Sequence, residues 1–243
     1  MKKFGFTLAE ILVTLSIIGV VSALTVPALS QNVQNRTYEA SIKKAYNTVS
    51  NAVDRYMADE GLSSLSNSEI TTKNGLRSFV KKYFKVVQDC ETTYYSSNGA
   101  SCYAPQYFSL DKSATTNTAM GQCIIVVGLA DGSSMCLDNG NMEDVPVDKD
   151  INGDGVIDEN DKLHATQGIW DDDRIMSIEV DTNGPNGPNI VGRDIFSMQV
   201  NSRGLVYGAD YGLSREAFIQ KYRKNAWPMS ISYLQKNGWR MDY

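Results

Sequence analysis

The strongest chemical signal in the sequence is a series of oxygen-bearing side chains at regular intervals. Its members are Asp150, Asn152, Asp154, Asp158 and Asp161. They occupy positions 1, 3, 5, 9 and 12 of a twelve-residue loop, in which Gly155 allows a sharp turn and Val156 offers its carbonyl oxygen at position 7. Because Ca2+ prefers oxygen ligands at this spacing, the loop predicts a structural calcium site.

The register of this loop has one alternative. In the favoured register the last ligand is Asp161 rather than the usual bidentate Glu, a departure that resembles the loops of dockerin-like modules. A second register beginning at Asp148 puts Glu159 at position 12, but it places Gly155 where an apolar residue belongs. A solvated acidic turn that binds no ion is the remaining interpretation.

A second, weaker candidate for a cation site lies in a Gly, Pro and Asn-rich loop. Its oxygen ligands would be Asp181, Asn183 and Asp194. Turn chemistry explains most of this composition, since these residue types are the ones that turns favour.

The remaining composition argues against an enzyme. The chain holds one histidine, His164, which excludes two-histidine zinc sites, and its four cysteines form no CxxC pair. A nucleophile with an adjacent base is not evident. The formal net charge of −5 argues against a nucleic-acid partner.

An apolar segment close to the N-terminus contains one charged side chain. Residues 6–29 carry Glu10 alone among charged residues and are long enough to cross a bilayer core of about 30 Å as a helix. Lys2 and Lys3 precede the segment and favour a cytoplasmic N-terminus, which places the rest of the chain outside the cytoplasm. A carboxylate inside an apolar segment costs about 2.5 to 3.5 kcal/mol, so Glu10 needs a partner.

The residues around this segment resemble the prepilin processing motif of type IV pilins and type II secretion pseudopilins. A short basic leader ends at Gly5, the aromatic Phe6 follows, Glu10 lies four positions later and Pro27 lies near the end of the apolar run. The resemblance implies that a prepilin peptidase cleaves between Gly5 and Phe6 and methylates the new amine. It also implies that Glu10 neutralises the N-terminal amine of a neighbouring subunit during assembly.

The same resemblance implies partners and location. The partners are other pilin or pseudopilin subunits, the prepilin peptidase and an inner-membrane assembly platform. The subunit would wait in the bacterial inner membrane and then enter a periplasmic or cell-surface filament. The loop over residues 181–196 resembles, more weakly, a loop of some pilin-like heads. A plain membrane anchor, or a secretory signal cleaved near Ala23 or Ala28, is the alternative.

Helical periodicity continues beyond Pro27. Apolar residues recur at spacings of three and four between charged ones, which predicts that one helix extends from Phe6 to about Gly61. Such a helix is roughly 80 Å long, so its first half must protrude from a head of this size. The expected organisation is a leader (1–5), a transmembrane and assembly helix (6–29), an amphipathic continuation (30–62) and a globular head (63–243).

Shorter patterns predict the elements of the head. Helices are expected over residues 76–87 and 214–225, and strands over residues 123–129, 134–137, 174–180, 194–200 and 205–207. The first two strands are joined through an Asp-Gly turn. A long helix followed by sequential hairpins predicts an α+β fold with the helix packed on an antiparallel sheet, which is the architecture of the pilin fold.

Four cysteines lie in the predicted head. An even number in an oxidising compartment indicates disulfides, and three pairings are possible. The favoured pairing joins Cys90 to Cys102 and Cys123 to Cys136, while free thiols or a four-cysteine metal site are the alternatives. Together these features predict a pilin or pseudopilin subunit, and a membrane-tethered calcium-dependent adhesion or binding module is the second hypothesis.

Overall fold

A computed structural model describes residues 5, 7–90, 102–116, 123–139, 173–210 and 212–243. The predicted calcium loop over residues 150–161 and the predicted first mature residue, Phe6, lie outside the described residues. The elements follow one another as a long helix, a short helix and a set of short strands, with two further short helices near the C-terminus.

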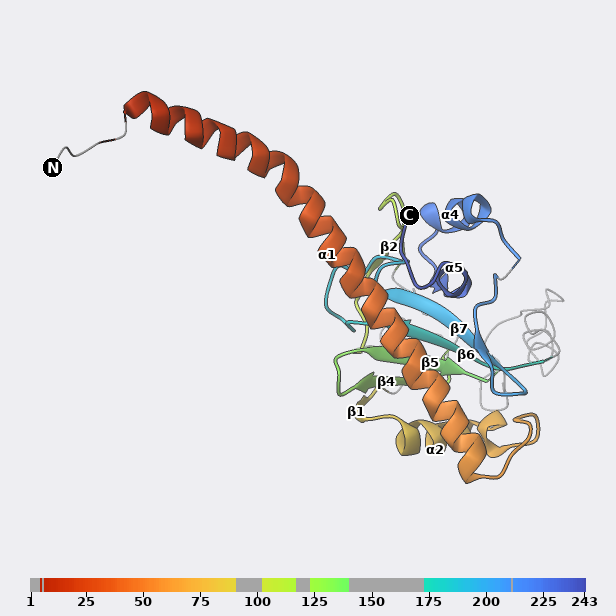
Figure 1. The fold of residues 1–243 in the computed structure, drawn as a ribbon. Coiled ribbons are helices and arrows are strands. Elements are labelled where there is room, and N and C mark those ends of the chain that lie inside the picture. Colours follow the sequence, from red (N-terminus) through yellow and green to blue (C-terminus); the bar gives the residue numbers. More distant parts are fainter. Residues whose placement is uncertain (1–4, 6, 91–101, 117–122, 140–172, 211) are drawn as a thin grey trace.

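The long helix α1 (Leu8–Asp59) projects far beyond the head, as Figure 1 shows. It begins with a capping box, because the Thr7 hydroxyl accepts from the Glu10 N–H (3.3 Å) while the Glu10 carboxylate accepts from the Thr7 N–H (2.8 Å). It ends close to the predicted position, just before Gly61, which has a φ of +63°. A left-handed backbone there favours glycine and stops the helix.

Only the second half of α1 belongs to the core of the head. The described side chains from Leu8 to Gln34 are exposed, and Asn35 is the first half-buried one. Beyond it the buried residues recur at helical spacing, namely Ile42, Val49, Val53 and Tyr56. The predicted protrusion of the first half is confirmed. Figure 1 also shows α1 bending in its exposed half, which contains Pro27, a residue whose ring removes one helical hydrogen bond.

The predicted helix over residues 76–87 is wrong at its C-terminal end. After a short 3-10 turn, η1 (Glu69–Thr71), the helix α2 (Lys73–Tyr83) stops at Phe84, and β1 (Val86–Asp89) follows. Val87 has helical spacing from Tyr83 but lies 69% exposed on the strand. Val86 instead pairs with Leu129 on the neighbouring strand. The pairing of β-branched residues in the sheet outweighs the helical spacing.

The head contains a sheet whose strands mostly follow the predicted hairpins. Its strands are β1, β4 (Ile125–Leu129), β5 (Ser134–Asp138), β6 (Arg174–Asp181), β7 (Ile195–Asn201) and β8 (Val206–Tyr207), in that spatial order. Each of these neighbours is antiparallel, as predicted. One further strand, β9 (Met229–Ser230), pairs with β7 in parallel, which the sequence pattern did not predict.

One face of this sheet and the second half of α1 enclose the core. Val127, Met135, Val180 and Phe196 pair in succession from β4 to β7, and all are buried in the same cluster as Ile42. Alternation along each strand sends the intervening residues to the other face. That face carries polar residues such as Glu179 and Ser197. The segment that follows Cys102 contacts it, because the Ser134 hydroxyl donates to the Cys102 carbonyl and the Tyr107 hydroxyl donates to Asp181.

Smaller elements complete the head. They are β2 (Tyr107–Phe108) paired with β3 (Thr115–Thr116), and the helices α4 (Arg215–Arg223) and α5 (Ser232–Lys236). Phe218 of α4 stacks on Tyr233 of α5, with ring centroids 5.2 Å apart. The predicted helix over residues 214–225 is confirmed as α4.

Candidate functional site

The cleavage site implied by the motif begins at an exposed glycine. A Cβ atom built on Gly5 would meet no neighbouring atom within 4 Å. The described fold therefore gives no steric reason for glycine at this position.

Glu10 lies three residues beyond the cap of α1, on its exposed first turn. One carboxylate oxygen accepts hydrogen bonds from the Thr7 N–H (2.8 Å) and from the Thr7 hydroxyl (2.7 Å). Sequence reasoning missed the role of Thr7, although a Thr followed three residues later by a Glu is the signature of a capping box. Among the described residues of the single chain, Thr7 therefore supplies the hydrogen bonds that satisfy this carboxylate.

The first half of α1 presents an apolar surface on all sides. Its exposed large residues include Leu12, Leu15, Ile18, Val21 and Leu29. Within the described residues α1 is the helix that is long and apolar enough to cross a membrane, and none of its most apolar stretch is buried. A helix that is apolar all round requires lipid or other protein around it.

The residues predicted as a second cation site meet where β6 ends and β7 begins. Asp181 pairs with Ile195 across the two strands, and the Thr182 N–H donates to the Asp194 carbonyl (2.8 Å). Both carboxylates are fully buried. Asp181 accepts from the Tyr107 hydroxyl (2.5 Å) and from the Asn183 N–H (3.1 Å).

Asp194 closes the same loop from the other side. Its two carboxylate oxygens accept from the backbone N–H groups of Asn189 (2.6 Å) and Ile190 (2.7 Å). Burial raises the pKa of Asp194 to about 6, and these backbone hydrogen bonds oppose the rise. Burial likewise raises the pKa of Asp181 to about 7, against the hydrogen bond from Tyr107, and the nearby charge of Asp194 adds to the rise.

The loop between these carboxylates offers oxygen ligands for a hard cation, but in the described part of the chain no cluster of acidic side chains surrounds one point. The side-chain oxygens of Asn183 and Asn189 are buried and have no hydrogen-bond partner among the described residues, so two amide oxygens remain unsatisfied there beside the two acids. Oxygen donors of this kind fit Ca2+. However, the described residues contain no cluster of three or more His, Cys, Asp or Glu side chains placed to hold a metal. The cation site therefore stays a prediction.

Both disulfides lie on the polar side of the sheet. Cys90 is bonded to Cys102 and Cys123 to Cys136, with Cα atoms 6.3 and 5.3 Å apart, which confirms the favoured pairing. These four residues form a buried cluster with Tyr103 and Val126. The Cys90–Cys102 disulfide therefore fixes the start of the segment that contains Tyr107, the residue that donates to Asp181.

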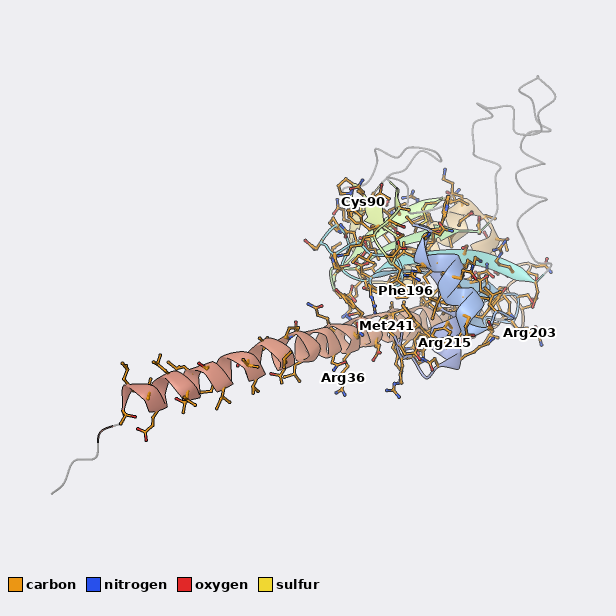
Figure 2. The ribbon with its side chains drawn as sticks, turned by 90° about the horizontal axis from the view of Figure 1, so that it is seen from above. Arg36, Cys90, Phe196, Arg203, Arg215 and Met241 are labelled. Atoms are coloured by element: carbon orange, nitrogen blue, oxygen red, sulfur yellow. A yellow bond between two sulfur atoms is a disulfide. The ribbon has the colours of Figure 1, made fainter. Side chains whose placement is uncertain are left out.

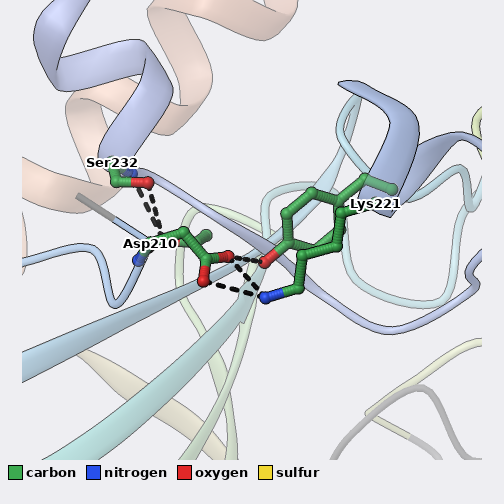
Figure 3. Close-up of polar contacts among 5 residues, drawn as sticks. Asp210, Lys221 and Ser232 are labelled. Atoms are coloured by element: carbon green, nitrogen blue, oxygen red, sulfur yellow. Dashed lines mark hydrogen bonds and ion pairs between the residues drawn. The ribbon is translucent and has the colours of Figure 1, made fainter. Parts of the chain in front are cut away.

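A second polar cluster joins the chain before α4 to that helix and to β9 (Figure 3). Asp210 accepts hydrogen bonds from the Lys221 ammonium (2.8 and 2.9 Å) and from the Tyr222 hydroxyl. The Asp210 N–H donates to the hydroxyl of Ser230, which in turn lies 3.1 Å from that of Ser232. Both serines are buried. Since every polar group here has a partner within the cluster, its evident role is to hold α4 in place.

Comparison with known families locates one match, at the N-terminus. No curated protein and no solved structure matches the chain. Residues 1–26 match the family described as the prokaryotic N-terminal methylation motif. This stretch includes Gly5, Phe6 and Glu10 and leads directly into the exposed half of α1. The chain thus carries the N-terminal methylation motif of type IV pilins and pseudopilins on a pilin-like α+β fold.

Proposed function

We propose that this chain is a structural subunit, a pilin or pseudopilin, of a type IV pilus-like or type II secretion filament. The observation that carries the proposal is the continuity between the methylation motif over residues 1–26 and a helix whose described side chains stay exposed up to Gln34. An apolar helix surface of this extent is stable in lipid or against other subunits. A filament subunit meets both environments, the membrane before assembly and the fibre core afterwards.

Processing in this proposal follows the motif. A prepilin peptidase cleaves after Gly5 and methylates the amine of Phe6. Lys2 and Lys3 hold the N-terminus in the cytoplasm before cleavage, so the head lies on the far side of the inner membrane. An inner-membrane assembly platform then moves the subunit into the filament.

Glu10 supplies the electrostatic contact between subunits. Its carboxylate neutralises the N-terminal amine of a neighbouring subunit, so two charges that are each costly in an apolar environment cancel. The hydrogen bonds from Thr7 support this role, because they satisfy the carboxylate in the single subunit before a neighbour is present. The proposal therefore assigns the carboxylate two successive partners.

Glu10→Gln tests the proposal, because it removes the charge and keeps the shape of the side chain. The matched control is Glu216→Gln, which removes the same charge from an exposed position on α4. The Glu10 variant should be cleaved and inserted like the natural chain but should lose fibres in electron micrographs, while the control should form them. Fibres of normal number and length from Glu10→Gln would refute the assembly role.

Calcium is a further component of the proposal. The loop over residues 150–161 would bind Ca2+ as a structural ion, and Asp181, Asn183 and Asp194 would form a second site. The second hypothesis is a membrane-tethered calcium-dependent adhesion or binding module. It predicts that the natural chain forms no fibres and that Glu10→Gln leaves binding intact, so the same experiment separates the two functions.

A further inference from the structure

The free part of α1 leaves the head at a defined point. Asn35 is the first residue of the helix with a half-buried side chain, and the described side chains before it are exposed. The free segment from Leu8 to Gln34 is roughly 40 Å long at about 1.5 Å per residue. The contacts at Asn35 are therefore the last ones that hold the helix before this free segment begins.

Arg193 makes the contact at this point. Its Nη1 donates to Asn35 Oδ1 (3.1 Å), and its Nη2 donates to the backbone oxygen of Tyr243 (2.7 Å). The guanidinium carbon lies 5.3 Å from the centre of the Tyr243 ring. One planar group thus joins α1 to the end of the described chain, which a lysine, with a single nitrogen, could not do in the same geometry.

The backbone around Arg193 is fixed by its own loop. The Arg193 N–H donates to the Ile190 carbonyl (2.9 Å), and the carboxylate of Asp194 holds the N–H groups of Asn189 and Ile190. Gly192 has a φ of +77°, and a Cβ there would lie 2.6 Å from the Met229 side chain. Because the backbone of this turn is constrained, the Arg193 side chain starts from a fixed position and can orient the helix that it contacts at Asn35.

The C-terminal residues extend the same contact along α1, as Figure 2 shows for Met241. The Met241 N–H donates to Glu39 Oε1 (2.7 Å), and the Trp239 ring lies 4.8 Å from that of Tyr46. Residues 239–243 therefore run along the helix from Tyr46 towards the end at which it leaves the head. Arg36, by contrast, projects from α1 away from these residues in Figure 2.

We infer that Arg193 is a positioning residue that fixes the direction in which the free half of α1 leaves the head. The consequence for assembly rests on the proposed function, because subunits can repeat in a helical fibre only if head and helix keep one relative angle. A rotation of about ten degrees at Asn35 moves the far end of the helix by about 7 Å. Loss of the contact should therefore change the geometry of the molecule more than its stability.

Pulsed electron spin resonance on the full chain in detergent micelles measures this angle without requiring a filament. Spin labels are attached at Ser22→Cys on the exposed half of α1 and at Gln220→Cys on α4, both exposed positions. The parent should give a narrow distance distribution. Ser22 lies about 20 Å from Asn35 along the helix, so Arg193→Ala and Arg193→Lys should each widen or shift the distribution by up to about 3 Å for every ten degrees of freedom gained. Arg203→Ala, at an exposed position in the turn between β7 and β8, should leave the distribution unchanged.

Two further measurements keep the inference falsifiable. Thermal unfolding should give nearly the same midpoint for Arg193→Lys as for the parent, since a residue with only a structural role would lower the midpoint and leave the distances unchanged. If Arg193→Ala does not fold, Asn35→Leu removes the acceptor on the helix and leaves the head intact. An unchanged distance distribution in Asn35→Leu and Arg193→Lys would overturn the inference. This result does not depend on whether Glu10→Gln forms fibres, which tests the proposed function.

Discussion

The Tyr107 hydroxyl donates a 2.5 Å hydrogen bond to the buried carboxylate of Asp181. This bond joins the segment that begins at the Cys90–Cys102 disulfide to the end of β6, on the sheet face opposite α1. A buried carboxylate is costly unless it accepts hydrogen bonds, so the bond contributes directly to the stability of the head.

Above the raised pKa of Asp181, about 7, Tyr107→Phe should therefore destabilise the head by about 1 to 3 kcal/mol, because it leaves the ionised carboxylate short of a donor. The matched control is Tyr103→Phe, since the buried Tyr103 hydroxyl has no hydrogen-bond partner within the part of the chain that the structure describes. That control should be neutral or slightly stabilising. Chemical unfolding in the presence of a chelator measures both. Equal losses in the two variants would show that the bond to Asp181 contributes nothing specific.

The disulfide Cys90–Cys102 should act on the same contact. Replacing both cysteines by serine should cost about 3 kcal/mol, the value expected for a closed loop of this length. Because the disulfide fixes the segment that contains Tyr107, the losses of unfolding free energy in the cysteine variant and in Tyr107→Phe should add up to more than the loss in the combined variant. A double-mutant cycle measures the overlap, and strictly additive losses would contradict the coupling.

An ion pair between α1 and the turn after β4 predicts that part of the stability of the head depends on pH. Lys44 lies 2.7 Å from Asp131, with 62% and 37% of the two side chains exposed. Burial raises the pKa of Asp131, but hydrogen bonds from Lys44 and Ser133 outweigh burial and hold it below its ordinary value of 3.8. The stabilisation is thus fully present above pH 3.8 and is lost as the pH falls through the lowered pKa.

Lys44→Ala should consequently cost about 0.5 kcal/mol at neutral pH, the size expected for a solvent-screened pair. The difference from the natural chain should vanish in acid, once Asp131 is protonated. Lys43→Ala, at the adjacent exposed position of α1, controls for the loss of a lysine. Unfolding free energies measured from pH 7 to well below the lowered pKa, at about pH 2, test this prediction. A difference that does not change with pH would exclude the ion pair as its cause.

Calcium binding is predicted from the sequence of residues 150–161. If the loop binds the ion, Ca2+ at one hundred times its dissociation constant should stabilise the natural chain by about 2.7 kcal/mol relative to a chelator. Asp150→Ala combined with Asp154→Ala should abolish this shift. A shift of unchanged size in the double variant would remove the loop from the mechanism. Asp181→Asn would then test the second loop.

The sequence predicted the fold where patterns are long. The helical spacing from Tyr38 to Tyr56 and the alternation within residues 174–180 and 194–200 correspond to α1, β6 and β7. Elements of two to five residues, such as β2, β9 and α5, carry too few residues for a period to be visible. The helix predicted to reach Val87 failed because strand pairing, a tertiary effect, decides the structure there.

For the candidate site too, the residues that lie close together in sequence could be predicted and the contacts between distant residues could not. Gly5, Phe6, Glu10 and Pro27 all lie within one short N-terminal stretch, so their pattern is visible without a structure. The contacts of Arg193 with Asn35 and Tyr243 join residues far apart in the chain, and no local pattern announces them. The capping role of Thr7 was visible in principle, since its signal spans only four residues.

The most direct test of filament function is the intact mass and N-terminal sequence of the protein isolated from its native membrane. A chain that begins at N-methylated Phe6 would establish processing by a prepilin peptidase and leave only the filament system to be identified. A chain that still begins at Met1, or one that has been cut near Ala23 or Ala28, would contradict the proposal and indicate an ordinary anchor or a secreted domain.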